Sequence, residues 1–441
     1  MTQIDRLQQL VSAARRAGAD QADALLAASA ALSVQRRLGR VEQLERSESV
    51  DLGLRVFVGK QQAIVSANEA DPAKFAALAE RAVAMARVVP EDPFAGIAEA
   101  VSFTIADLDL ADPVEPSAES LLSRAAAAEE AALAVPGVTN SEGAEANWSR
   151  TEIAIATSGG FAGHYARTFH SISATALAGS GTGMERDWDY STTVHLSDLG
   201  DAATIGRHAA EGAIRRLNPT RPASGRFPVV FHPRVAGSLL GHLSGAINGA
   251  SVARGTTFLK DSLGKRIMAA GLIVRDDPLR RRGLRSRPFD GEGMPGQPRA
   301  VVEDGVLTTW ILDWRSARQL GLASTGHASR GTSGPPSPAT TNLWLEPGTM
   351  TPKALMADIA EGIYVTDLIG MGVNGVTGDY SRGVAGFMIR HGELAESISE
   401  CTVAGNLREM FLHMTPANDL EFRRGTDSPT LRIEGLTLAG A

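Results

Sequence analysis

Cysteine is almost absent from this chain of 441 residues, in which Cys401 is the only one. A single thiol excludes an internal disulfide and any metal site built from several cysteines. Long apolar runs are missing as well, since no stretch reaches the roughly 18 uncharged apolar residues that a membrane-spanning helix needs. We therefore expect a soluble protein of the reducing cytoplasm that makes no contact with membranes.

Basic charge is also scarce, because 43 Lys and Arg residues stand against 50 Asp and Glu residues, for a formal net charge of −7. A protein that binds nucleic acid directly usually carries a basic excess or a basic patch. The composition therefore argues against direct binding of nucleic acid. Glycine, in contrast, is abundant with 46 residues, and this predicts many turns between short strands.

The first half of the chain alternates between helical and strand-like patterns. Within residues 1–19, apolar residues recur at helical spacing and predict an amphipathic surface helix rather than a targeting peptide. Residues 31–68 alternate between polar and apolar side chains, which predicts antiparallel strands with Gly39, Gly53 and Gly59 near the bends. Helices are expected at 72–88, 117–135 and 201–217, and a hairpin is expected over 151–179.

A linker rich in proline and glycine, residues 218–226, precedes a strand at 227–231 and a helix at 233–247. The remainder is glycine-rich and strand-like. We predict an α+β protein in which N-terminal mixed helix/antiparallel-sheet units are followed by a strand-rich, mainly β C-terminal domain. The expected domains are 1–95 (N-terminal α+β), 115–217 (helix plus hairpin) and 226–441 (C-terminal).

The histidines show no sequence-local metal motif. His164 and His170 share a face of the predicted hairpin, but six residues at about 3.3 Å each place them roughly 20 Å apart. His232 and His242 lie ten residues apart, which is about 15 Å of rise even on one helix. No H-x-x-x-H, H-E-x-x-H or C-x-x-C pattern occurs. We therefore predict no metal site and no cofactor from local motifs, which leaves only ligands assembled from distant segments.

Two short motifs have simpler explanations than the chemistry they suggest. Gly370, Gly372 and Gly375 match G-x-G-x-x-G, but the following residues VTGDYSRGVAG cannot form the helix that a dinucleotide site requires. We interpret this segment as a turn. Ser262 and Lys265 match S-x-x-K, but the supporting S-D-N and K-T-G motifs are absent. Lys265 is better explained as surface charge.

An acidic group surrounds an arginine-rich run and is made of Asp276, Asp277, Asp290 and Glu292. Its carboxylates could bind a cation or a peptide amine. The preferred interpretation is an Asp-Pro turn and an Asp-Gly turn, with exposed arginines neutralised by their neighbours. Cys401, among strand-forming residues, is interpreted as a small buried apolar residue rather than a nucleophile.

Long ordered strings in the C-terminal half resemble the TldD/PmbA family, and within it the PmbA (TldE) branch. They are VVFHPRVAGSLLGHLSGAINGASVARGTTFLKDSLGK (229–265), EDGVLTTWILDWRSARQLGLASTGHA (303–328) and NGVTGDYSRGVAGFMIRHGEL (374–394). The resemblance is strong from about Phe227 onward and looser before it. It implies one subunit of a cytosolic two-chain metallopeptidase. The pair is associated with maturation of a gyrase-targeting microcin and turnover of an antitoxin, which explains the label "modulator of DNA gyrase".

The resemblance also implies where a metal would sit. In the TldD chains, H-E-x-x-x-H on a helix and a cysteine near the C-terminus supply a zinc-type site. In this sequence the first histidine position falls on Gly241, the glutamate position on His242 and the second histidine position on Ala246. Gly and Ala offer no donor atom, and the C-terminal segment from Ala417 contains no cysteine or histidine. The expectation is a chain without catalytic or metal-binding residues of its own.

Two hypotheses of different class follow. The first is a non-catalytic subunit that forms a heterodimer with a TldD-type catalytic chain and helps enclose a peptide-processing cavity. The second is a stand-alone homodimer that binds extended or unfolded peptides, or modulates gyrase, without hydrolysis. In that hypothesis an extended peptide adds a strand to a sheet edge of the C-terminal unit. A weaker third possibility is an unrelated hydrolase that uses scattered His and acidic residues.

Overall fold

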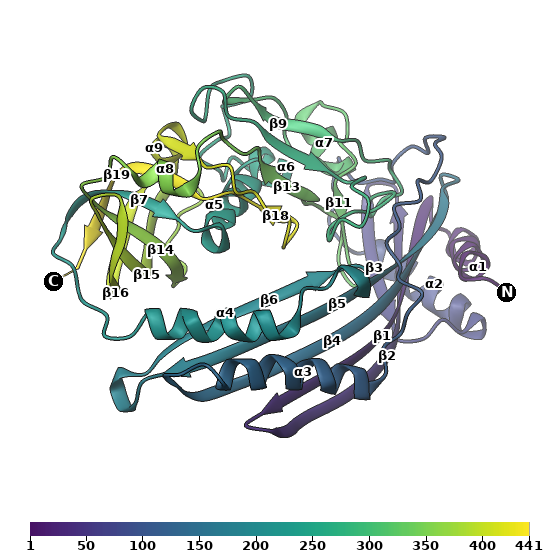
Figure 1. Ribbon diagram of the computed structural model, residues 1–441. Helices are drawn as coiled ribbons and strands as arrows, with labels where there is room; N and C mark the ends of the chain where they lie inside the picture. The colour runs from purple at the N-terminus through teal and green to yellow at the C-terminus, as the bar shows by residue number, and fades with distance from the viewer. Residues whose placement is uncertain (441) are drawn as a thin grey trace.

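Six antiparallel strands form one long curved sheet, which underlies the rest of the molecule in Figure 1. The computed structural model describes residues 1–440. The strand order is β3-β2-β1-β4-β5-β6, and strand β1 pairs with β4 from Asp23↔Thr157 to Arg36↔Ala144. Segments 1–95 and 115–217 therefore share one sheet. Its strands are β1 Gln21–Arg37, β2 Arg40–Val58, β3 Gln61–Ala67, β4 Val138–Thr157, β5 Ala162–Ala178 and β6 Glu185–Thr193.

Four helices cover one face of this sheet: α1 Gln3–Arg16, α2 Phe75–Ala86, α3 Ala118–Leu133 and α4 Ala202–Arg215. Strand side chains alternate between the two faces, and even-numbered residues such as Leu26, Ala146 and Ile172 pack against these helices. The odd-numbered residues of β1, β4 and β5 therefore point to the opposite face, toward the C-terminal domain (Figure 1). Short 3₁₀ helices lie at Pro72–Lys74, Gly181–Gly183 and Leu196–Asp198.

The C-terminal domain is built around a second six-stranded sheet of order β16-β15-β14-β7-β19-β17. Strand β16 also pairs with β19 over Thr402–Ala404, so the sheet closes on itself there. The bounds are β7 Gly225–Phe231, β14 Glu361–Ile369, β15 Asp379–Arg390, β16 Glu393–Asn406, β17 Met414–Pro416 and β19 Leu431–Ala439. Helix α5, Pro233–Ala246, packs against this sheet through Leu239, Leu240 and Leu243, which are buried.

A smaller sheet of order β10-β9-β8-β13-β18 and a two-stranded pair, β11 and β12, complete the domain. These strands are β8 Val274–Asp277, β9 Arg299–Glu303, β10 Val306–Leu307, β11 Ala328–Ser329, β12 Ser337–Pro338, β13 Asn342–Leu345 and β18 Thr426–Asp427. The remaining helices are α6 Gly249–Ala253, α7 Trp314–Leu320, α8 Pro352–Met356 and α9 Leu407–Leu412. None of the helices within residues 1–440 has the length and apolar content that crossing a membrane requires.

The predicted α+β class with a strand-rich C-terminal region is confirmed, and each predicted helix is present within a few residues. Two local expectations were wrong. Strand β1 begins at Gln21, ten residues before the alternating stretch, because an alanine-rich segment forms strand here despite its helical propensity. Gly53 lies inside β2 rather than at a bend. A Cβ there would collide with the backbone of Thr332, so the close approach of a C-terminal loop requires this glycine.

Candidate functional site

Helix α5 carries the three positions at which the family resemblance places metal chemistry. The helix begins after His232, whose Nδ1 accepts a hydrogen bond from the backbone N–H of Arg234 at 3.0 Å. Burial, helped by the adjacent Arg234 charge, lowers the pKa of His232 to about 4. Gly241, His242 and Ala246 lie on the last two turns, as the sequence predicts.

These residues do not fit a zinc ion. Gly241 is exposed, and no atom lies within 4 Å of the position that a Cβ would take. Ala246 belongs to the apolar core. His242 packs edge-on to Tyr380 with ring centroids 6.1 Å apart, and its Nε2 is buried without a hydrogen-bond partner. Within residues 1–440, no group of three or more His, Cys, Asp or Glu side chains is placed to hold a metal ion. No metal-dependent step can be derived from this chain's own residues.

The other candidate residues lie where the simpler interpretations place them. His164 is exposed and His170 is buried, and both lie on the helix-covered side of β5. Residues 370–378 form the loop between β14 and β15, in which Gly370 has a φ of +77°. Lys265 is exposed, and its backbone N–H donates to the Ser262 carbonyl. The Cys401 thiol is buried in β16, and burial raises its pKa.

The acidic group forms the predicted turns, but most of its carboxylates are buried. The turns themselves are present, since Asp277 Oδ1 accepts from the Leu279 N–H and Asp290 Oδ1 accepts from the Glu292 and Met294 N–H groups. However, the carboxylates of Asp276, Asp290 and Glu292 are buried. Their partners come from distant segments, and no local pattern in the sequence signals such partners.

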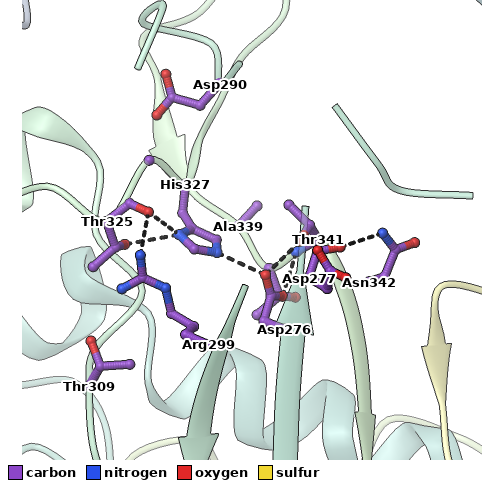
Figure 2. A network of polar contacts seen from close by, with 12 residues as sticks. Asp276, Asp277, Asp290, Arg299, Thr309, Thr325, His327, Ala339, Thr341 and Asn342 are labelled. Atoms are coloured by element: carbon purple, nitrogen blue, oxygen red, sulfur yellow. Dashed lines mark hydrogen bonds and ion pairs between the residues drawn. The ribbon is translucent and has the colours of Figure 1, made fainter. Parts of the chain in front are cut away.

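Asp276 is the centre of a buried polar network, shown in Figure 2. The Oδ1 atom of Asp276 lies 2.9 Å from Nε2 of His327, and neither side chain is exposed to solvent. The backbone N–H of Thr341 donates to Asp276 Oδ2 at 2.7 Å. On its other side, Nδ1 of His327 lies 2.8 Å from the carbonyl oxygen of Thr325. The pair joins β8 to the segments around β11 and β13 and is fully enclosed, so its role is structural.

Asp290 and Glu292 belong to a second buried network, which joins the large sheet to the C-terminal domain. Asp23 on β1 binds Arg55 on β2 and Arg330 beyond β11, and the Arg55 guanidinium lies 3.8 Å from the Glu292 carboxylate. Burial raises the pKa of Glu292 to about 8, and this effect exceeds the opposing influence of Arg55. Burial raises the pKa of Asp290 as well.

A cavity of about 500 Å³ lies beside this network, between the free face of the large sheet and two loops of the C-terminal domain. Strands β1, β4 and β5 supply one wall, and residues 285–291 and 329–332 supply much of the other. A second cavity, of about 740 Å³, lies between β6, helix α4, the start of α5 and residues 419–428. There Arg234 stacks on Trp188 at 4.6 Å while its Nη1 binds Asp187 at 2.5 Å, so the charge of Arg234 is already paired.

Three family models match the chain in succession and together cover most of it. They describe PmbA/TldA metallopeptidase domain 1 (residues 22–86), the central domain (111–217) and the C-terminal domain (224–440). Metalloprotease PmbA of Escherichia coli O157:H7 is 36% identical over 426 residues, which are 96% of this chain and 92% of that protein. The Metalloprotease PmbA homolog of Haemophilus influenzae is 32% identical over 98% of this chain and 94% of that protein.

Solved structures show the same fold. A candidate modulator of DNA gyrase from Bacteroides thetaiotaomicron superposes with a TM-score of 0.90 at 26% identity, over 99% of this chain and 98% of the other. TldE from Thermococcus kodakarensis superposes with a TM-score of 0.90 at 19% identity, over 99% of this chain and all of the other. The three ordered matches and the PmbA relatives agree with one another along nearly the whole chain. This chain belongs to the PmbA/TldD family of metallopeptidases.

Proposed function

We propose that this chain is a non-catalytic subunit of the PmbA (TldE) type. It pairs in the cytoplasm with a TldD-type catalytic chain, and the two together enclose a chamber in which peptides are cleaved. The observation that carries the proposal is the state of helix α5. At the two histidine positions, Gly241 has open space around it and Ala246 is part of the core, so neither offers a donor atom.

The residues around α5 do not supply alternative ligands for a zinc site. His242 occupies the position of the general base, but its ring packs against Tyr380 and its Nε2 is buried without a hydrogen-bond partner. Cys401, the only thiol, is enclosed in β16 and its Sγ faces the Val384 carbonyl at 3.7 Å. A catalytic zinc site needs about three protein ligands, and these residues supply one nitrogen at most.

The test is co-expression with a TldD-type chain from the same organism that carries an intact H-E-x-x-x-H motif. We expect the two chains to co-elute as a heterodimer in size-exclusion chromatography. We also expect peptide hydrolysis to require the partner and to be lost on addition of a chelator. Failure of the two chains to associate at micromolar concentrations would contradict the proposal.

A stand-alone peptide-binding homodimer remains the second candidate, and one feature favours it. Strand β2 pairs with β1 along its whole length, but β3 covers only Leu52–Val58 of its other side. Residues 40–51 therefore present an exposed strand edge, which is where an extended peptide or a second chain can add a strand. The edge lies on the large sheet and not on the C-terminal unit, whose sheet closes through β16 and β19. Recovery of homodimers and no TldD-type chain from native cells would favour this candidate.

A further inference from the structure

The wall that the large sheet gives to the 500 Å³ cavity is apolar, and the strand register explains why. Ala27 on β1 lies opposite Ile153 on β4, which in turn lies opposite Tyr165 on β5. Residues directly opposite one another on antiparallel strands point to the same face. Leu25 and Ile155 form the next row in the same way. Two rows of mostly apolar side chains from the sheet therefore line the cavity.

Phe289 extends this apolar floor from the C-terminal domain. Its ring packs edge-on against Tyr165, with centroids 5.2 Å apart, and against Phe161, with centroids 5.0 Å apart. Gly163, between these aromatic residues on β5, is required for the contact, because a Cβ there would lie 2.9 Å from the Phe289 ring. The floor is therefore a fixed aromatic and aliphatic surface.

Three arginines line the same cavity without a carboxylate partner. Arg167 follows Tyr165 on the same face of β5, and Arg285 and Arg287 lie on the opposing loop. Within residues 1–440, no Asp or Glu oxygen lies within ion-pair distance of any of the three. The side chains of Arg167 and Arg287 donate hydrogen bonds to backbone carbonyls, Arg167 to Leu284 and Arg287 to Ala328 and Ala339. The Nε atoms of Arg167 and Arg287 are buried without an acceptor.

Positive charge exceeds negative charge in the cavity lining, which contains four arginines and the two carboxylates of Asp51 and Asp290. Burial lowers the pKa of Arg167, and the nearby Arg287 guanidinium lowers it further, so two like charges face the same space. Arg330 also lines the cavity, but its charge is taken up by Asp23. Asp290 accepts hydrogen bonds from three backbone N–H groups, and burial raises its pKa although the nearby Arg287 charge opposes the rise. Asp51 lies opposite Ala27, at the end of that row.

We propose that this cavity binds a carboxylate carried on an apolar group. The guanidinium forks of Arg167, Arg285 and Arg287 match the planar carboxylate, and the floor around Phe289 takes the apolar part. The volume of about 500 Å³ suits a group of the size of one or two amino acids. Two sources share this chemistry: the C-terminal end of a peptide whose last side chain is apolar, and a free amphipathic carboxylate. The inference goes beyond the proposed function, because it assigns a binding site to this chain itself, and its test does not require a TldD-type partner.

Isothermal titration calorimetry of the full-length chain tests the inference with four ligands. They are an N-acetylated tripeptide that ends in leucine with a free carboxylate, the same peptide with an amidated C-terminus, octanoate, and inorganic phosphate. We expect the free-carboxylate peptide to bind at least about tenfold more tightly than the amide and than phosphate. Tighter binding of the peptide than of octanoate assigns the peptide as the source, and the reverse assigns the free carboxylate.

Matched variants identify the site. Arg285→Gln removes an exposed guanidinium without disturbing the core, and Arg167→Gln removes a half-buried one. Each is expected to weaken binding about tenfold, whereas Arg186→Gln, an exposed arginine outside the cavity, leaves it unchanged. Thermal melting checks that each variant is folded. Equal binding of acid and amide, equal binding of phosphate, no binding of either carboxylate at millimolar concentration, or affinity unaltered by Arg285→Gln would overturn the inference.

Discussion

Asp23 on β1 and Arg330 beyond β11 form a buried ion pair, with Oδ1 and Nη1 2.6 Å apart, although 307 residues separate them in sequence. Arg55 binds the other carboxylate oxygen of Asp23. Burial alone would raise the pKa of Asp23, but the charges of Arg330 and Arg55 hold it below its usual value. The pair ties the N-terminal sheet to the C-terminal domain at the edge of the arginine-lined cavity.

Removal of Asp23 should therefore be costly. Asp23→Ala leaves two buried guanidinium groups without their shared carboxylate, and we expect a loss of about 3–5 kcal/mol in the free energy of unfolding. Glu142→Ala, which breaks the exposed pair with Arg186, should cost less than about 1 kcal/mol. Urea denaturation of the variants gives both values. Equal losses in the two variants would show that the Asp23 pair does not join the domains.

Glu292 should make the protein less stable as the pH rises. Its folded pKa of about 8 lies above the usual glutamate value of 4.5, so the folded state retains a proton that the unfolded state has released. The stabilisation is complete below about pH 4.5 and is lost as the pH rises toward 8. Glu292→Gln should flatten the fall in stability over this window, whereas Glu80→Gln on the exposed face of α2 should keep the wild-type slope. An unchanged slope in Glu292→Gln contradicts the assignment.

His232 should have the opposite effect at acid pH. Its folded pKa of about 4 lies below the usual histidine value of 6.5, so the unfolded state takes up a proton first and stability falls as the pH drops from 6.5 to 4. The full effect is about 3 kcal/mol. Asn is a good N-cap, so His232→Asn should keep the cap of α5 and remove this part of the acid sensitivity. Chemical denaturation of the wild-type chain and of His232→Asn at pH 4.5 and pH 7 gives the loss of stability between the two pH values. The same loss in both proteins would refute the prediction.

Gly241 should tolerate a side chain. It lies in the interior of α5 with open space at its Cβ position, so Gly241→Ala should raise stability by about 0.5–1 kcal/mol. Gly237, on the same helix, is the control. A Cβ there would lie 2.8 Å from the Thr426 carbonyl, and Gly237→Ala should be destabilising. If Gly241→Ala were the more damaging of the two, the geometry of α5 described above would be wrong.

The sequence predicted the local elements well and the long-range contacts poorly. The spacing of Leu7, Leu10 and Val11 on α1 and of Ile205 and Ala209 on α4 reports burial of one helical face, and such periodicity needs no knowledge of partners. The role of Gly53 depends on Thr332, a residue nearly 280 positions away, and cannot be read from its neighbours. For this reason the glycine was expected at a bend.

In the candidate site, too, the local features were predicted and the contacts between distant segments were not. The positions of Gly241, His242 and Ala246 on a helix follow from the family strings, and the structure places them there. The cavity with Arg167 and Arg287 escaped prediction because its walls come from strands near the N-terminus and loops near residue 290. The burial of Asp276 and Glu292 was not predicted for the same reason. An acidic run beside arginines is typical of a solvated surface, and here the segments that cover it are distant in sequence.

The most direct test of the central claim is peptide hydrolysis by a pair in which only this chain is intact. The TldD-type partner is prepared with the glutamate of its H-E-x-x-x-H motif replaced by glutamine and mixed with this chain, and the wild-type pair serves as the control. We expect chelator-sensitive hydrolysis by the wild-type pair and none by the variant pair or by this chain alone. Chelator-sensitive hydrolysis by this chain alone, or by the variant pair, would contradict the claim.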